Sequence, residues 1–298
     1  MTSKPQVKMI PKVDWTRQLA AHRCQAEFYT LPARKRRGAG ISHPVEDFLF
    51  QYYPFPLALL EKWHPGVGYC LEWDLPEIGL HFSNRCYSVA DGMMFCDPVL
   101  MTRKSRESLR WILELLVATQ NRPPNFACHG LHEWAMVYRG SQVRHEQVAK
   151  LRLPQAEIDA LVEARAISCS HYDAFRHFAP EAVSYNHLKP TIETRTRSEQ
   201  PGCVHANMDL YKWAAKAMPW VGSEILIDCF KLAIQLRDLD MRASPYDLGE
   251  WGYSPIQIET NEGRKIYENE QKRLTFNALE IRNILIKQLL KLNLEQSL

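Results

Sequence analysis

The sequence lacks the features that define several common protein classes. No apolar run reaches about 18 residues, so no membrane-spanning helix is expected. The first twelve residues carry three lysines and no apolar core segment, which argues against a secretory signal and predicts a cytoplasmic protein. The formal net charge is only +3, from 37 basic and 34 acidic residues, so the total charge alone does not indicate a partner.

The cysteines show no metal-binding or disulfide pattern. The eight cysteines are spread over 298 residues, and no two of them form a CxxC pair. This spacing argues against a disulfide framework and against a four-cysteine zinc site. We therefore expect reduced and mostly buried thiols.

Several enzyme motifs are also missing. The chain has no GxGxxG motif, no P-loop, no GxSxG elbow and no SxxK motif, and it lacks the HxE…PCxxC signature of zinc deaminases. Dinucleotide-dependent, ATP-dependent and serine-hydrolase functions therefore have little support from the sequence.

Hydrophobic periodicity predicts a mostly α fold with a minor β component. Helical patterns cover residues 14–37, 105–119, 130–139, 154–164, 205–218, 223–239 and 262–294. Residues 65–100 are short, glycine-punctuated and β-like, 166–170 resemble a buried strand, and Ser223 is a natural N-cap. We expect a single large two-lobed helical domain, with a flexible segment 1–13, an N-terminal lobe 14–122 and a site-bearing C-terminal lobe 123–298. The boundary is placed at Pro123-Pro124, which stops the preceding helix.

Histidine is concentrated in one part of the chain. Seven of the eleven histidines lie within residues 129–205, about a quarter of the sequence. The first cluster contains His129, His132 and Glu133, which share a helical face at i, i+3 and i+4 and can present ligands to one metal ion. The alternative is helix capping together with a buried Trp134.

Two further clusters follow along the chain. His171 and Asp173 come directly after the expected strand, where they can orient a base, bind a metal ion or cap the next helix. His205, Asp209 and Lys212 stack at i, i+4 and i+7 on a helix, so each would change the protonation of the others, as acid–base sites require. A solvated polar stripe is the competing interpretation.

Another charged segment lies near residue 240. Arg242 stands between Asp240 and Asp247 in the loop that follows the helix 223–239. It can hold an anionic substrate, or it can tie the loop to a buried carboxylate.

Six segments taken together resemble a known bacterial family. They are His43–Phe50, Gly130–Arg139, His171–Arg176, Glu199–Cys203, His205–Trp213 and Asp240–Asp247. As a set they resemble a family commonly labelled 3-methyladenine DNA glycosylase, over residues 14–275. The motifs do not look like those of the helix-hairpin-helix or mixed-β alkyladenine glycosylases.

This resemblance implies an enzyme that releases an alkylated purine from DNA without a cofactor. Such an enzyme extrudes the damaged base and uses a carboxylate to assist hydrolysis of the N-glycosidic bond. The candidate catalytic residues are Glu133, Asp173, Asp209 and His171. The candidate substrate-binding residues are Trp134, Arg176, Tyr211, Lys212 and Arg242. The basic residues 34–37 and Arg103, Lys104, Arg106 and Arg110 are candidates for phosphate contacts.

Two alternatives stay open. The first is a metal-dependent enzyme acting on a small molecule, with zinc, iron or manganese bound by members of a ligand pool. That pool consists of His132, Glu133, His171, Asp173 and His205. The second is a non-catalytic binding protein whose C-terminal helix 262–294 contacts a partner or forms a homodimer.

Overall fold

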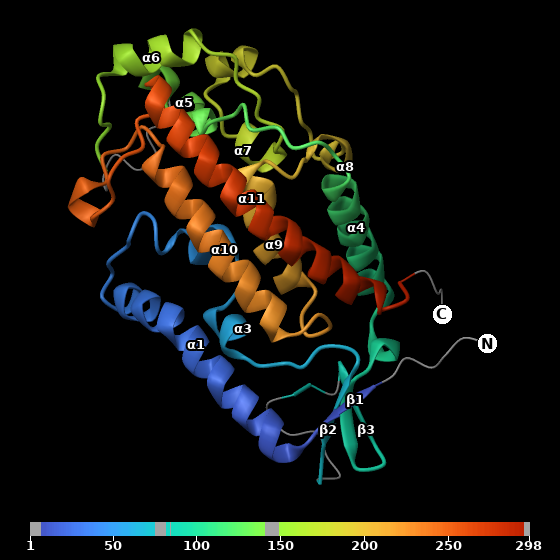
Figure 1. The fold of residues 1–298 in the computed structure, drawn as a ribbon. Coiled ribbons are helices and arrows are strands. Elements are labelled where there is room, and N and C mark those ends of the chain that lie inside the picture. The colour runs from blue at the N-terminus through green and yellow to red at the C-terminus, as the bar shows by residue number, and fades with distance from the viewer. Residues whose placement is uncertain (1–6, 75–81, 84, 141–148, 295–298) are drawn as a thin grey trace.

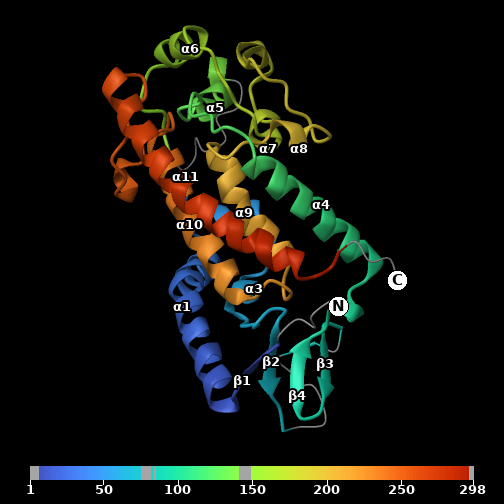
Figure 2. The same ribbon diagram turned by 45° about the vertical axis from the view of Figure 1, so that its right-hand side comes forward.

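The computed structural model confirms a mostly helical fold with one small sheet. It describes residues 7–74, 82–83, 85–140 and 149–294, and it is 57% helical with 7% strand. The strands lie at one end of the molecule, and the short helices between residues 131 and 198 gather at the other end (Figures 1 and 2). One buried hydrophobic cluster runs from Ile10 to Leu294 and so includes side chains from both halves of the chain.

The N-terminal part combines a sheet with a long helix. Its elements are β1 (Lys8–Ile10), α1 (Lys12–Gly38), α2 (Phe48–Tyr52), α3 (Leu57–Glu61), β2 (Tyr69–Glu72), β3 (Tyr87–Ala90), β4 (Met93–Cys96), η1 (Pro98–Leu100) and α4 (Arg103–Gln120). The strand order is β1-β2-β4-β3, with β1 parallel to β2 and the other pairs antiparallel. Asp91 and Gly92 both have positive φ and join β3 to β4, as a tight hairpin requires. Strand β1 lies inside the segment that we expected to be flexible.

The C-terminal part holds the long helices of the core. Its elements are α5 (Leu131–Met136), η2 (Tyr138–Gly140), α6 (Gln155–Glu163), α7 (Tyr172–Phe175), η3 (Pro180–Tyr185), α8 (Arg195–Ser198), α9 (Val204–Lys216), α10 (Ser223–Arg242), η4 (Gly249–Trp251) and α11 (Asn261–Leu290). Helix α9 packs against both α10 and α11, and nearly all of its residues are buried. The buried α9 therefore carries any polar residue of its sequence into the interior.

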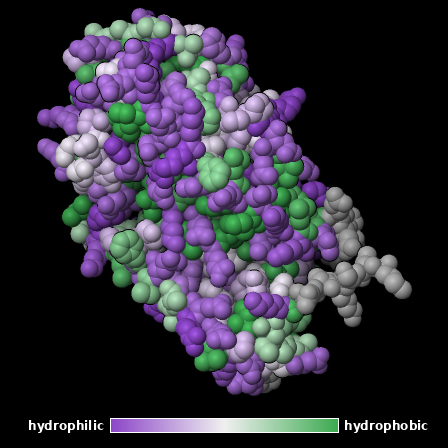
Figure 3. Space-filling model, in the orientation of Figure 1, coloured by the Kyte–Doolittle hydropathy of each residue, from purple (hydrophilic) through white to green (hydrophobic). Residues whose placement is uncertain are grey.

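The face of the molecule shown in Figure 3 has hydrophilic and hydrophobic side chains interspersed. Helix α11 is the element that the sequence predicts to contact a partner. On α11, Leu274, Ala278 and Leu285, which are spaced for a partner helix, are buried in the core of their own chain. Contact with a second chain through these residues is therefore blocked in this structure.

Two local predictions from the sequence are wrong. Residues 166–170 form no strand, and only a single parallel bridge joins Ile167 to Asn186. The side chain of Asn186 replaces a partner strand, because it accepts from Cys169 N at 2.8 Å and donates to Cys169 O at 3.0 Å. Ser223 is not the N-cap of α10, since Gly222 takes that position. The Ser223 hydroxyl instead accepts from His64 N and donates to Lys62 O.

Candidate functional site

Three buried histidines meet where α5, the start of α7 and the start of α9 come together. The ring centroids of His132 and His205 are 4.6 Å apart, and those of His171 and His205 are 5.5 Å apart. His132 is 3% exposed, His205 is 9% exposed and His171 is fully buried. Gly130, with φ of 77°, is the N-cap of α5, and it lies so close to the C-cap of α10 that a Cβ on it would sit 3.3 Å from Ala243 Cβ. This close approach of glycine brings His132 to the end of α10.

The first group of potential ligands consists of His132, His205 and Asp240. One ligand atom from each lies within 4.8 Å of the others. His132 Nε2 is 3.1 Å from Asp240 Oδ1, and its Nδ1 is 3.4 Å from Cys128 Sγ. Arg237 Nη1 lies 3.2 Å from Glu133 Oε1 and 3.7 Å from Asp240 Oδ2. The group is therefore a buried centre with both carboxylate and imidazole donors.

Burial and charge set the protonation of this first group. Burial alone lowers the pKa of His132, but the charges of Asp240 and Cys128 outweigh burial and raise that pKa well above its ordinary value. Burial raises the pKa of Asp240, yet the charge of His132 outweighs it and lowers that pKa. Burial, aided by the charge of His132, lowers the pKa of His205 to about 3. His205 is therefore a neutral imidazole at neutral pH, which is the form that binds metals.

The second group consists of His171, Asp173 and Asp209, and its carboxylates are already paired with cations. Arg195 Nη2 is 3.0 Å from Asp209 Oδ2, and Lys212 Nζ is 3.0 Å from Asp173 Oδ2. His171 Nε2 is 3.3 Å from Asp209 Oδ2. Burial raises the pKa of Asp209, but the hydrogen bond and charge of His171 outweigh it, and that pKa is lowered. This group is an ion-pair network in which an ammonium and a guanidinium neutralise the carboxylates.

A small polar cavity adjoins the first group. Its volume is about 10 Å³, roughly the space that one water molecule needs. His132 and His205 line it, together with Ser170 and Gln271. Ser170 Oγ and Gln271 Oε1 are buried without a hydrogen-bond partner among the described residues. A water molecule in this cavity could satisfy the oxygens of Ser170 and Gln271 beside the ring of His205.

Three of the four residues predicted for catalysis, His171, Asp173 and Asp209, belong to the second group, and the fourth, Glu133, contacts Arg237 beside the first group. His205, Asp209 and Lys212 project from one helix, and Asp209 Oδ2 is 3.4 Å from Lys212 Nζ. Arg176 lies at the edge of the second group, 3.2 Å from Asp173. His129 lies apart from the centre and contacts Glu268 at 3.5 Å.

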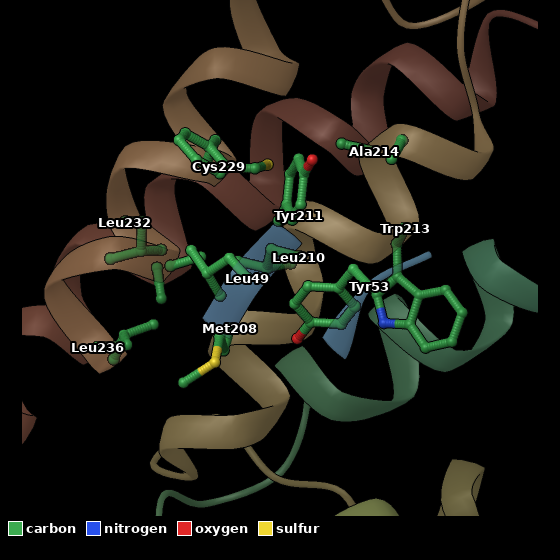
Figure 4. Close-up of a cluster of buried hydrophobic side chains, with 14 of the residues drawn as sticks. Leu49, Tyr53, Met208, Leu210, Tyr211, Trp213, Ala214, Cys229, Leu232 and Leu236 are labelled. Atoms are coloured by element: carbon green, nitrogen blue, oxygen red, sulfur yellow. The ribbon is translucent and has the colours of Figure 1, made fainter. Parts of the chain in front are cut away.

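Three predicted substrate-binding residues are engaged elsewhere. Trp134 is fully buried and donates from Nε1 to Ala243 O at 2.8 Å. Tyr211 lies in the hydrophobic cluster with Tyr53 (Figure 4), where it is 2% exposed. Arg242 contacts Asp238 at 3.5 Å and donates to Ser254 O. In this arrangement the two aromatic rings are part of the core and present no exposed face to a base.

The basic clusters also have partners inside the protein. Arg34 and Arg36 pair with Glu61 and Asp47, each at 2.6 Å. Arg106 is 9% exposed and donates to the carbonyl of Pro98. Arg110 donates to the carbonyl of Leu294, whereas Arg103 is highly exposed and pairs with Glu107.

Several residues of the centre were not singled out from the sequence as site residues. They are Tyr53, Cys128, Arg195, Glu199, Arg237 and Asp240. The exposed polar stripe of α10 includes Glu224, Asp228 and Gln235, while Arg237 and Asp240 lie off that stripe and are buried. Charged residues on the otherwise apolar face of a helix are the signal that could have revealed these two.

Comparison with known proteins gives no relative from which a function can be transferred. No match was found among protein-family models, curated proteins or solved structures. Within the described residues, no helix combines the length and apolarity that crossing a membrane requires. Any functional conclusion therefore depends on the geometry of the site.

Proposed function

We propose that the protein is a metal-dependent enzyme that acts on a small molecule, with its ion held by His132, His205 and Asp240. One observation carries this proposal: two imidazoles and one carboxylate place ligand atoms within 4.8 Å of one another. Two histidines and a carboxylate are a frequent ligand set for catalytic zinc and for non-haem iron.

The surroundings of these three residues also support a metal ion. Asp240 Oδ1 is buried, and its nearest cationic partner is His132 Nε2 at 3.1 Å, with no hydrogen bond of good geometry to that oxygen within the described residues. A metal ion would replace the proton of His132, after which His132 Nε2 and Asp240 Oδ1 could both bind the ion. No hydrogen bond to the ring of His205 is found in the part of the chain that the structure describes. A third observation is the adjoining polar cavity, which gives an ion with three protein ligands an open position for water or substrate.

The second group is a poorer candidate for an ion, although its donor types are the same. Arg195 and Lys212 both lie within hydrogen-bond distance of its carboxylates. A divalent cation there would have to displace or repel these charges. We therefore propose a single ion, bound at the first group.

The bound ion would supply Lewis acidity or an activated water. Either role suits hydrolysis, and iron in a site of two histidines and one carboxylate would also permit oxygen chemistry. The chain's own residues orient the ligands: Cys128 Sγ lies beside Nδ1 of His132, so Nε2 is directed to the centre. Arg237 bridges Glu133 and Asp240 and holds the carboxylate ligand in place.

The test is elemental analysis by plasma mass spectrometry of the untagged protein, produced in medium supplemented with zinc, iron and manganese. We expect about one equivalent of one of these metals per chain. His205→Gln and Asp240→Asn should lose it, because each removes a ligand.

Two variants serve as controls for this test. His129→Gln changes a histidine in the same segment that lies outside the centre, and His171→Gln changes a buried histidine that belongs to the second group. Both should keep the metal. A metal-free wild type, or a His205→Gln protein that retains its metal, would contradict the proposal.

DNA glycosylase activity, which the resemblance implies, is the second candidate. One observation favours it: Asp173 is ionised and its side chain is partly exposed at the edge of the second group. Burial raises the pKa of Asp173, but the charge of Lys212 outweighs burial and lowers it. Release of free base from alkylated DNA by chelator-treated protein, with Asp173→Asn inactive, would support this function. If no free base is released, the glycosylase function is excluded.

A further inference from the structure

A second cavity of the protein shares no lining residue with the proposed metal centre. Its volume is about 440 Å³, which is within the range of small-molecule binding sites. It lies between strand β1, the start of α1, the start of α10 and the end of α11, on the side where these helices face the sheet (Figures 1 and 2). The proposed metal-dependent activity makes no use of this space.

The lining of this cavity is partly apolar and partly acidic. Its apolar and aromatic members are Ile10, Trp63, Tyr69, Val221, Ile225 and Ile284. Asp14 on α1 and Glu224 and Asp228 on α10 contribute three carboxylates, against the two basic side chains of Lys8 and Arg17. Such a lining suits a ligand that has an apolar body and a charged end.

The carboxylates of the cavity are incompletely neutralised. Glu224 and Asp228 are four residues apart on α10, so they share a face of the helix, and like charges at that spacing repel each other. Asp228 pairs with Lys231 at 3.6 Å, and Asp14 pairs with Arg17 at 3.6 Å. Within the described residues, no cation lies at ion-pair distance from Glu224. A positive charge in the cavity would therefore relieve this repulsion.

A buried acceptor at the end of α11 points to the same ligand chemistry. Gln288 lines the cavity, and its Oε1 is buried without a hydrogen-bond partner among the described residues. An unsatisfied buried carbonyl oxygen is unfavourable, and an N–H group of a ligand would satisfy it. The lining thus combines negative charge with a free acceptor, which is the complement of a charged donor.

We propose that this cavity binds a primary amine with an apolar body, in its ammonium form. The carboxylates of Glu224 and Asp228 and the amide oxygen of Gln288 recognise the ammonium group, which carries three donors. The apolar body packs on the lining near Trp63 and Tyr69, whose rings also favour a cation. The inference goes beyond the proposed metal-dependent activity and does not rest on it.

The experiment is isothermal titration calorimetry on the full-length protein after treatment with a chelator. The probes are 2-phenylethylamine and hexylamine, with 2-phenylethanol as the neutral control and 3-phenylpropionate as the anionic control. We expect at least one amine to bind at one site per chain, with a Kd of about 1 mM or below. The alcohol and the acid should bind about tenfold more weakly or not at all.

Three variants test which residues recognise the amine. Glu224→Gln and Gln288→Met should each weaken amine binding by about three- to tenfold and leave stability to urea nearly unchanged, because each removes charge or an acceptor from the cavity and keeps the side-chain size. Asp238→Asn is the matched control, since Asp238 is a partly exposed acid on the same helix outside the cavity, and it should bind the amine like the wild type.

Several outcomes would overturn the proposal. They are no binding of either amine, equal binding of the alcohol, tighter binding of the acid, and an affinity that neither Glu224→Gln nor Gln288→Met changes. Tighter binding of the acid would assign the cavity to anions through Lys8. Because the protein is free of metal in every titration, a negative result is distinguishable from failure of the proposed metal centre.

Discussion

Substitution of Asp209 by asparagine is the sharpest test of the buried ion-pair network. Asp209 is 1% exposed, and its carboxylate contacts Tyr53 at 2.7 Å, Arg195 at 3.0 Å and Lys212 at 3.4 Å. The amide oxygen of asparagine can still accept from Tyr53, but the negative charge is lost. Removal of one partner of a buried ion pair costs about 3–5 kcal/mol, because the other charge stays buried and unpaired.

The structure places the expected loss at the lower end of that range. Arg195 keeps Glu199 at 2.6 Å, and Lys212 keeps Asp173 at 3.0 Å, so neither cation is left without a carboxylate. We expect Asp209→Asn to lower the free energy of unfolding by about 3 kcal/mol at pH 7, measured by urea denaturation. Asp173→Asn, at the partly exposed edge, should cost only about 1 kcal/mol.

The pH dependence gives an independent check. The folded state lowers the pKa of Asp209, so its contribution to stability is present above the unfolded value of about 3.9 and is lost as the pH falls towards the folded value. The stability difference between wild type and Asp209→Asn should therefore be constant from about pH 6 to 8 and shrink below about pH 4. A difference under about 1 kcal/mol at pH 7, or one that grows on acidification, would refute this account of the network.

Two further predictions concern the backbone and DNA. Gly263→Ala should destabilise the protein by about 3 kcal/mol in thermal or urea unfolding, because the added Cβ would lie 1.9 Å from Gln257 O. Gly38→Ala is the control and should be nearly neutral, since nothing lies within 4 Å of the added Cβ. If the protein binds DNA through the start of α4, replacing Arg103 and Lys104 by glutamine should reduce the slope of log K against log salt by about 2. An unchanged slope would exclude that surface as the DNA contact.

The elements best predicted from the sequence are the ones with strong periodicity or clear end signals. Helix α4 carries Leu109, Ile112 and Leu116 on one buried face, as the sequence pattern indicates. Helix α9 and helix α10 also begin within a residue of their expected starts. Periodicity works here because the pattern and the burial have the same cause, one apolar face turned to the core.

The errors arise where a distant side chain replaces a local partner. Ile167 and Cys169 alternate like a strand, but the amide of Asn186 satisfies the backbone of Cys169 in place of a ladder. Ser223 has the chemistry of an N-cap, but the chain at Lys62 and His64 uses its hydroxyl. A propensity describes the local chain and contains no information about which remote groups need a partner.

The ligand pool shows the same limit at the level of chemistry. From the sequence, His132, His171 and His205 belong to one pool of imidazoles with nearby carboxylates. In the structure that pool divides into two groups with the same donor types and different charge surroundings. Arg195 and Lys212, whose charges are permanent at neutral pH, neutralise one group. In the other group Asp240 is paired at 3.1 Å with His132, which can give up its proton to a metal ion, and His205 is neutral. A list of possible ligands therefore cannot identify a metal site, because the positions of the competing cations decide which carboxylates remain available.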